Sequence, residues 1–228
     1  MTNEDAALLE RCARMGTSTW SDALDACEIN GVVQGIARRS GEGLAIGFAA
    51  TARHEWGPYG AFDRADFAVG RLVAATGPGR VLMVDVGGAA ISTFGGIASL
   101  AASKRGASGL VIDGACRDTD EIRATGLTMA SRWVTPTTGK TRLRLQSMGE
   151  PVTIGGVTVK EGDLVLVDDT GIVVVPRAEL ARVLVEAERI LAVDHAVEKG
   201  VRAGKSFAES AADANYIPLK KTPATHDA

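Results

Sequence analysis

Hydrophobic residues near the middle of the chain form continuous runs of the kind found in strands buried on both faces. Val81 to Val86 is one such run and ends at two glycines, and Gly109 to Asp113 is a second. Between them, Gly96 to Arg105 is rich in small residues and ends in basic ones, which indicates a helix. A strand, a helix and a strand within about 35 residues predict a βαβ unit with two parallel strands.

The pattern before this unit is more broken. Helices are expected over Leu8 to Arg14 and Thr19 to Cys27, the second capped by Thr19 or Ser21. From Gly31 to Arg53, glycines alternate with short apolar runs, which predicts antiparallel strands with tight bends. Asp63 to Ala75 has helical spacing and is followed by a Gly-Pro-Gly turn.

The later third changes character. Pro151 to Val175 alternates in polarity between glycine turns and predicts β-hairpins, and Glu179 to Lys199 has the spacing of a long helix. Beyond Gly204 the chain is polar, and we expect a loosely ordered tail or an arm on a neighbouring subunit. The chain is thus expected to form one mixed α/β domain over residues 1–204, with a tail over 205–228.

Composition narrows the function classes. With 228 residues, 46% of them hydrophobic, the chain can bury one large α/β core. Its net charge is -3 and its basic residues are scattered, which argues against nucleic acid as a partner. Apolar runs are too short to span a membrane, and the N-terminal segment lacks a secretory pattern. Cys12, Cys27 and Cys116 show no paired spacing, so a cytoplasmic location is expected.

Nucleotide-binding motifs are absent. The first buried strand is not followed by the GxGxxG spacing of dinucleotide-binding folds. Gly139-Lys140-Thr141 resembles the end of a phosphate-binding loop but lacks the upstream glycine. His54, His195 and His226 are scattered, so each is interpreted as a surface or packing residue rather than a metal ligand.

Two candidate chemical features follow the buried strands, where ligands bind in parallel sheets. The first is the helix start at Gly95 and Gly96. Unpaired N–H groups of a first helical turn attract anions, and glycine permits close approach of a carboxylate or phosphate. The alternative is that both glycines only allow a tight turn.

The second feature is Arg117-Asp118, with Asp120 and Glu121 just behind. The arginine fork suits a carboxylate, and a single aspartate can hold Mg²⁺, which keeps most of its waters. The alternative is a surface salt bridge. The neighbouring Cys116 could be a thiol of lowered pKa, although a small buried packing residue is the simpler interpretation.

These segments resemble a known family. The resemblance covers Val84 to Gly88, Phe94-Gly95-Gly96 and Ala107 to Asp118, and extends to Thr17 to Asp25 and Gly162 to Pro176. The chain is similar to 4-hydroxy-4-methyl-2-oxoglutarate aldolases, 4-carboxy-4-hydroxy-2-oxoadipate aldolases and the regulator of ribonuclease E activity A, the RraA-like family. The resemblance runs from about residue 17 to 200.

The resemblance implies a swivelling β/β/α domain in homotrimers or homohexamers, with active sites at subunit interfaces. It also implies a carbon–carbon lyase that releases pyruvate through an enolate, with oxaloacetate decarboxylase activity as a second expectation. The backbone of Gly95, Gly96, Ile97 and Ala98 would then contact pyruvate. Arg117 would bind its oxygens, and Asp118 would hold Mg²⁺, Mn²⁺ or another divalent cation.

One departure bears on the substrate. Many of these aldolases carry an acid directly after the loop glycine, where this chain has Gly96. Two alternatives therefore stay open beside the aldolase. The first is a non-enzymatic regulator that binds a ribonuclease. The second is a lyase that acts on another substrate, bound near Trp56, Tyr59 or Phe94. The base for the C4 hydroxyl is also open between a metal-bound water, an acid such as Glu121 and a neighbouring subunit's carboxylate.

Overall fold

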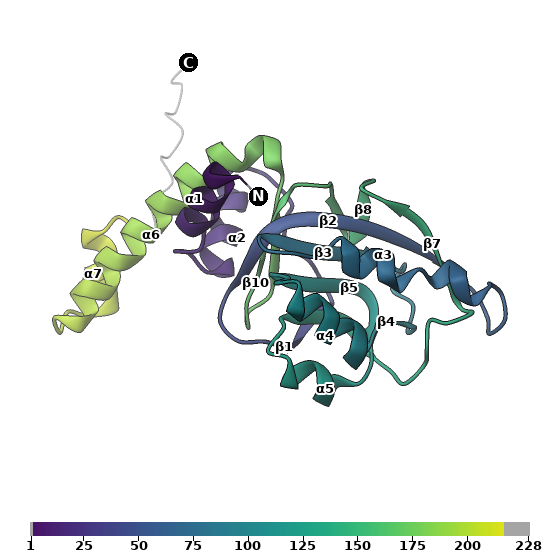
Figure 1. The fold of residues 1–228 in the computed structure, drawn as a ribbon. Coiled ribbons are helices and arrows are strands. Elements are labelled where there is room, and N and C mark those ends of the chain that lie inside the picture. The colour runs from purple at the N-terminus through teal and green to yellow at the C-terminus, as the bar shows by residue number, and fades with distance from the viewer. Residues whose placement is uncertain (1, 217–228) are drawn as a thin grey trace, which may run out of the picture.

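The computed structural model describes residues 2–216, and these form a strongly curled mixed sheet with helices at its sides (Figure 1). The strands are β1 (Ala37–Ser40), β2 (Ala45–Trp56), β3 (Arg80–Asp85), β4 (Ser92–Phe94), β5 (Gly109–Cys116), β6 (Met129–Val134), β7 (Leu143–Met148), β8 (Val152–Ile154), β9 (Val157–Val159), β10 (Leu164–Val167) and β11 (Ile172–Val175). The main sheet has the order β1-β6-β5-β3-β2-β10-β11, with β4 beside β5 and β7 beside β2. The expected mixed α/β class is confirmed.

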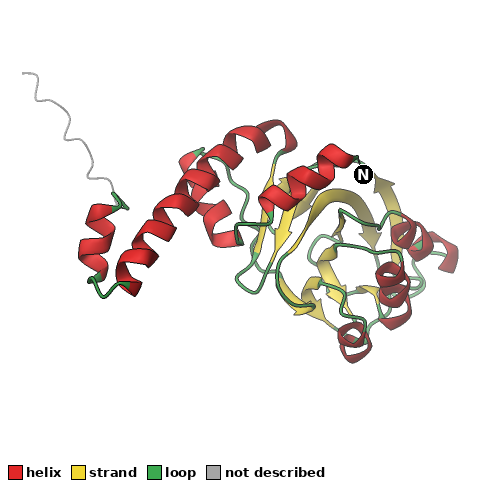
Figure 2. Ribbon diagram, turned by 60° about the vertical axis from the view of Figure 1, so that its left-hand side comes forward, coloured by secondary structure: helices red, strands yellow, loops and turns green. Residues whose placement is uncertain are grey.

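The helices gather in two groups, one to the left of the other in the view of Figure 1. They are α1 (Asn3–Cys12), α2 (Thr17–Ala26), α3 (Val69–Ala74), α4 (Gly96–Lys104), α5 (Thr119–Ala124), α6 (Leu180–Arg202) and α7 (Phe207–Asp213), with two short 3-10 helices, η1 (Arg64–Phe67) and η2 (Arg177–Glu179). Helices α3, α4 and α5 lie together along the sheet, whereas α1, α2 and α6 form the second group (Figures 1 and 2).

The predicted βαβ unit is confirmed. Strands β3 and β5 are parallel neighbours, with Val81 opposite Gly109 and Asp85 opposite Asp113, and α4 connects them. Both strands are almost entirely buried, as their continuous apolar runs indicate. The sequence prediction missed β4, a three-residue strand that pairs with the end of β5 just before α4 begins.

Three other local predictions need correction. The strands within residues 31–53 do not pair with each other: β1 pairs with β6, while β2 lies between β3 and β10. The helix over residues 63–75 is broken into η1 and α3, because Ala68 has a left-handed backbone with φ 47°. The second helix starts at Thr17, with Gly16 as its N-cap, so neither Thr19 nor Ser21 caps it.

The later third agrees with its pattern. Strands β8 and β9 form one antiparallel hairpin around Gly155-Gly156, and β10 and β11 form another. Helix α6 starts one residue later than expected, at Leu180, and ends three residues later, at Arg202. The prediction of a loosely ordered tail is wrong for residues 207–213, which form α7 packed against α6.

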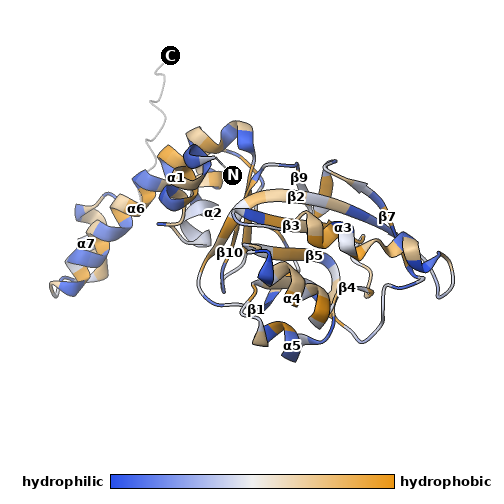
Figure 3. Cartoon of the chain, in the orientation of Figure 1, coloured by the Kyte–Doolittle hydropathy of each residue, from blue (hydrophilic) through white to orange (hydrophobic). Residues whose placement is uncertain are grey.

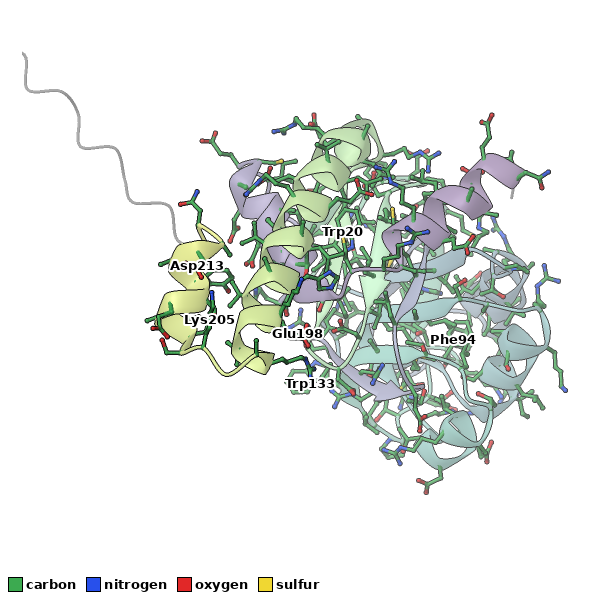
Figure 4. All side chains as sticks on the ribbon, turned by 90° about the vertical axis from the view of Figure 1, so that its left-hand side faces the viewer. Trp20, Phe94, Trp133, Glu198, Lys205 and Asp213 are labelled. Atoms are coloured by element: carbon green, nitrogen blue, oxygen red, sulfur yellow. The ribbon has the colours of Figure 1, made fainter. Side chains whose placement is uncertain are left out.

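Figure 4 shows α6 and α7 side by side, with Lys205 and Asp213 facing each other. Their ammonium and carboxylate groups form an ion pair of 2.6 Å. Residues 217–228 lie outside the described residues, so the arm on a neighbouring subunit and the boundary at residue 204 stay predictions. No helix within residues 2–216 is long and apolar enough to cross a membrane.

Three buried clusters explain how these elements hold together. One fills the space between the sheet and helices α3, α4 and α5, and includes Leu82, Phe94 and Ile122. A second lies inside the curl, between the main sheet and the β8–β9 hairpin. A third joins α1, α2 and α6 to β10 and β11 around Trp20. Figure 3 shows the apolar colouring of β3, β5 and α4 that accompanies this packing.

Candidate active site

A cavity of about 510 Å³ lies where β4, α4 and the end of β5 meet. It is the place at which the sequence analysis expected its two chemical features. The cavity is lined by Phe67, Val69, Gly70, Val73, Ser92, Thr93, Phe94, Gly95, Ile97, Ala98, Ala101, Arg117, Asp118, Glu121, Thr138 and Lys140. Gly95, Ile97, Ala98, Arg117 and Asp118 are thus brought together as expected.

The two glycines at the start of α4 make room for charged side chains. A Cβ on Gly95 would lie 2.4 Å from Oδ2 of Asp118, and a Cβ on Gly96 would overlap the carboxylate of Glu121. Gly95 has an extended backbone, so neither turn geometry nor a left-handed conformation explains its lack of a side chain. The interpretation of both glycines as a tight turn is therefore insufficient: they allow carboxylates to reach the helix start.

The backbone around Asp118 directs its carboxylate into this corner. Asp118 has a left-handed conformation with φ 54°, which Asp and Asn tolerate better than most residues, and it is the N-cap residue of α5. Its Oδ2 accepts a hydrogen bond of 3.1 Å from the N–H of Gly96 and lies 3.4 Å from Nε of Arg117. Within residues 2–216, Oδ1 accepts no hydrogen bond, which leaves it open to a ligand.

Arg117 and Asp118 are each 37% exposed at the side chain, so their ion pair is only partly screened from solvent. Both residues line the cavity, so the ion pair differs from the ordinary surface salt bridge that was the alternative interpretation. The N–H of Arg117 donates to the carbonyl of Phe94, which ties the end of β5 to the strand that precedes α4. The guanidinium thereby stays beside the helix start.

A divalent cation is compatible with this donor set. No three His, Cys, Asp or Glu side chains among the described residues are grouped closely enough to hold an ion by themselves. Mg²⁺ commonly takes one or two protein carboxylates and completes its shell with water and substrate oxygens. Asp118, with Glu121 lining the same cavity, fits that requirement.

The sequence analysis missed several lining residues. Phe67, Val69 and Val73 come from η1 and α3, and Thr138 and Lys140 come from the loop before β7. Lys140 belongs to the Gly-Lys-Thr segment that was set aside as a phosphate loop. No local signal ties it to Arg117, because the cavity forms only when β6 returns the chain to the end of β5.

Other candidates lie elsewhere. Asp120 is almost fully exposed and pairs with Arg123. Trp56 and Tyr59 are exposed and lie outside the cavity lining, and the Tyr59 ring packs against the Arg142 guanidinium. Of the three aromatic residues considered, only Phe94 borders the cavity, and it is fully buried (Figure 4).

The cysteine and histidine interpretations can also be judged. Cys116 is buried, and burial raises the pKa of its thiol, which contradicts a reactive thiol and confirms a packing residue. His54 is buried against Phe67, and burial lowers the pKa of its imidazole. His195 is exposed, and His226 lies outside the described residues.

Comparison with known proteins gives a consistent result. The model of the RraA-like family, described as aldolase/RraA, matches residues 17–174. Protein DlpA of Legionella pneumophila is 26% identical over 210 residues, which is 92% of this chain but 34% of DlpA. A protein of Ectopseudomonas mendocina, provisionally named 4-hydroxy-4-methyl-2-oxoglutarate aldolase, is 38% identical over 104 residues, which is 45% of this chain and 63% of that protein.

A solved structure agrees in fold. The crystal structure of Streptomyces coelicolor RraAS2, described as an unusual member of the RNase ES inhibitor RraA protein family, is 26% identical to this chain. The two superpose with a TM-score of 0.71, over 79% of this chain and 91% of the other. From the family match over residues 17–174 and this fold, the chain belongs to the RraA-like (aldolase/RraA) family.

Proposed function

We propose that this chain is a divalent-metal-dependent carbon–carbon lyase that cleaves a 4-hydroxy-2-oxo acid and releases pyruvate through an enolate. The observation that carries the proposal is the cavity in which Arg117, Asp118 and the start of α4 meet. Decarboxylation of oxaloacetate passes through the same enolate, so the proposal includes that activity. The relatives named as aldolases support it.

The first step is binding of the 2-oxo acid. The N–H of Gly96 already donates to Asp118, but those of Ile97 and Ala98 are first-turn groups without partners inside α4. With the positive end of the helix dipole they attract a carboxylate. The planar fork of Arg117 can bind the carbonyl and carboxylate oxygens of the same molecule.

Cleavage then moves negative charge onto the C2 oxygen as the C3–C4 bond breaks. A positive group held beside that oxygen stabilises the transition state more than the ground state, and Arg117 supplies one. Asp118 would hold the divalent ion, with Glu121 beside it, and such an ion when bound supplies Lewis-acid polarisation of the oxygens. Glu121 is the acid in the cavity that can take the proton of the C4 hydroxyl.

A pyruvate-release assay tests this proposal. Purified protein would be given 4-hydroxy-4-methyl-2-oxoglutarate and oxaloacetate, each with Mg²⁺, with Mn²⁺ and with EDTA. We expect pyruvate from at least one substrate, with the rate lost in EDTA and restored by added cation. No pyruvate under any of these conditions, with the cation present, would contradict the proposal for these substrates.

The alternative is a protein that regulates a ribonuclease by binding it. Its support is the likeness in fold to RraAS2, a protein described as an unusual member of the RNase ES inhibitor family. Catalytic inactivity on 2-oxo acids together with dose-dependent inhibition of an RNase E-type enzyme would favour this role. Arg117→Ala distinguishes the two, because cavity residues should matter to lyase activity and not to binding through an outer surface.

We also propose that the protein works as a homotrimer or homohexamer with its sites at subunit interfaces. Ile97 is 85% exposed and Leu100 is about half exposed on α4, directly beside the cavity. Exposed aliphatic side chains at such a position favour burial by another subunit. Light scattering should give three or six times the chain mass of 23.6 kDa.

A further inference from the structure

The cavity is larger than a pyruvate unit requires. Its volume is about 510 Å³. Pyruvate has six heavy atoms, and at roughly 30 Å³ for each water-sized group it would fill about 180 Å³. In one subunit, more than half of the cavity is therefore left beside a bound pyruvate unit.

An apolar wall borders this space. It consists of Phe67 of η1, Val69 and Val73 of α3, and Ala98 and Ala101 of α4. These five side chains carry no charge and no hydrogen-bonding group, and from Ala98 to Ala101 the helix rises about 4.5 Å. A wall of this length is longer than a single methyl group needs, and it gains most from contact with a larger hydrocarbon group.

Thr93 of β4 gives the cavity one unused polar group. Its side chain is 2% exposed, and within the described residues its hydroxyl has no hydrogen-bond partner. A buried hydroxyl without a partner is destabilising, so native structures usually satisfy it with a ligand or a water. Thr93 lines the cavity, but its hydroxyl oxygen is itself buried, so a hydrogen bond to a substrate oxygen requires this side chain to turn toward the cavity.

We propose that the substrate is a 4-hydroxy-2-oxo acid with an apolar substituent larger than a methyl group at C4. The apolar wall binds this substituent, and Thr93 hydrogen-bonds the C4 oxygen. The inference rests on the proposed lyase function. In the reaction the C4 hydroxyl loses its proton, the C3–C4 bond breaks, an aldehyde forms at C4, and C3 of the enolate gains a proton to give pyruvate.

Substrate comparison is the first arm of the test. The isopropyl-substituted 4-hydroxy-5-methyl-2-oxohexanoate would be compared with 4-hydroxy-2-oxoglutarate, which carries a carboxylate in the same place. We expect kcat/KM to be at least tenfold higher for the isopropyl compound, the lower range for apolar-pocket discrimination. Equal rates, or a preference for the dicarboxylate, would overturn the inference and point to Lys140 as a carboxylate contact instead.

Two variants form the second arm. Ala101→Asp introduces a charge into the wall at an exposed helix position and should reduce the preference for the isopropyl substrate at least tenfold. The matched control is Ala124→Asp, at an exposed alanine of α5 outside the cavity lining, which should leave the preference unchanged. An unchanged preference in Ala101→Asp would contradict the role of the wall.

Thr93→Val keeps the shape of the side chain and removes its hydroxyl. We expect the Tm to stay equal or rise, because an unpartnered hydroxyl is lost, while kcat/KM for the isopropyl substrate falls at least tenfold. A purely structural hydroxyl would give the reverse: a lower Tm with unchanged kcat/KM.

A separate readout distinguishes failure of this inference from failure of the lyase proposal. Exchange of the pyruvate methyl protons with deuterium, followed by NMR in the wild-type protein with Mg²⁺, reports enolate formation without any C4 substituent. Exchange together with no apolar preference would overturn only the substrate class. Absence of both exchange and cleavage would overturn the proposed function as well.

Discussion

Asp118 combines an uncommon backbone conformation with a carboxylate oxygen, Oδ1, that accepts no hydrogen bond within residues 2–216. Its left-handed φ of 54° favours Asp or Asn over alanine. The alanine side chain cannot form a local hydrogen bond, and alanine is disfavoured in this conformation by about 1–2 kcal/mol. We therefore predict that Asp118→Asn unfolds at nearly the wild-type urea concentration and has lost its Mg²⁺-stimulated turnover. Asp118→Ala should lose both stability and turnover. Metal-stimulated activity in Asp118→Asn would exclude this carboxylate as the cation ligand.

In the proposed reaction, the positive charge of Arg117 stabilises the negative charge that develops on the C2 oxygen in the transition state. Removal of a single donor to a developing oxyanion typically costs roughly 3 kcal/mol, or about 100-fold. We predict that Arg117→Ala lowers kcat/KM for pyruvate release by at least that factor. Arg123→Ala, on the neighbouring helix and outside the cavity lining, is the control and should retain the wild-type rate. A near-wild-type rate in Arg117→Ala would remove the residue from the site.

For single residues, the sequence identified Arg117 and Asp118 as candidates but not the reason for their position. The spacing from the two glycines to Arg117-Asp118 can be seen in the sequence of this chain alone. That Gly95 and Gly96 lack side chains because Asp118 and Glu121 occupy the space is a tertiary contact, with no signal in the local sequence. Thr93 was missed for the same reason, since one threonine in a short strand is unremarkable until its hydroxyl is seen without a partner.

Elements far apart in sequence depend on close backbone contacts. A Cβ on Gly31 would lie 2.2 Å from the carbonyl oxygen of Val174 in β11, and neither backbone can easily move. We predict that Gly31→Ala lowers the free energy of unfolding by roughly 2–3 kcal/mol, measured by urea denaturation. Gly70→Ala, in α3 with open space around it, should be neutral or stabilising. Equal stability of the two variants would contradict this packing.

Asp168 joins the β10–β11 turn to the start of α2. Partial burial opposes its ionisation, but hydrogen bonds from the backbone and hydroxyl of Thr17, and from the N–H groups of Thr170 and Gly171, outweigh that effect and lower its pKa. A carboxyl with a lowered folded-state pKa contributes stability above its unfolded pKa of about 3.9, and loses it as pH falls through the folded value.

The stability difference between wild type and Asp168→Asn should therefore depend on pH. We predict that wild type is the more stable above about pH 5 and that the difference shrinks as pH falls below about 4. Thermal unfolding across this range measures it. A difference that stays constant down to about pH 2 would show that the charge of Asp168 contributes nothing to stability through these hydrogen bonds.

Helices and strands were predicted correctly where the hydrophobic pattern was long and unbroken. The buried runs of β3 and β5 and the long α6 were identified directly. It failed where tertiary contacts set the pairing, as for β1 with β6, and where one residue changed the backbone, as at Ala68. Strands β4 and β6 were missed, yet they bring Thr93 and the loop of Lys140 to the cavity.

For the whole molecule, the curled sheet and its two helix groups follow the family fold, and the cavity lies on the side of α3, α4 and α5. The α6–α7 hairpin lies beyond residues 17–174, which the family model matches. The assembly and the compartment of the protein stay predictions from the sequence and from the exposed face of α4.

The central claim is that one corner of this cavity holds a pyruvate unit between the start of α4, Arg117 and a cation on Asp118. A crystal structure of the protein soaked with pyruvate and Mg²⁺ tests it directly. The account predicts pyruvate oxygens bonded to the Arg117 guanidinium and to N–H groups of Ile97 and Ala98, with the ion bound by Asp118 directly or through water. Pyruvate bound elsewhere, or an empty cavity at saturating pyruvate and Mg²⁺, would contradict it.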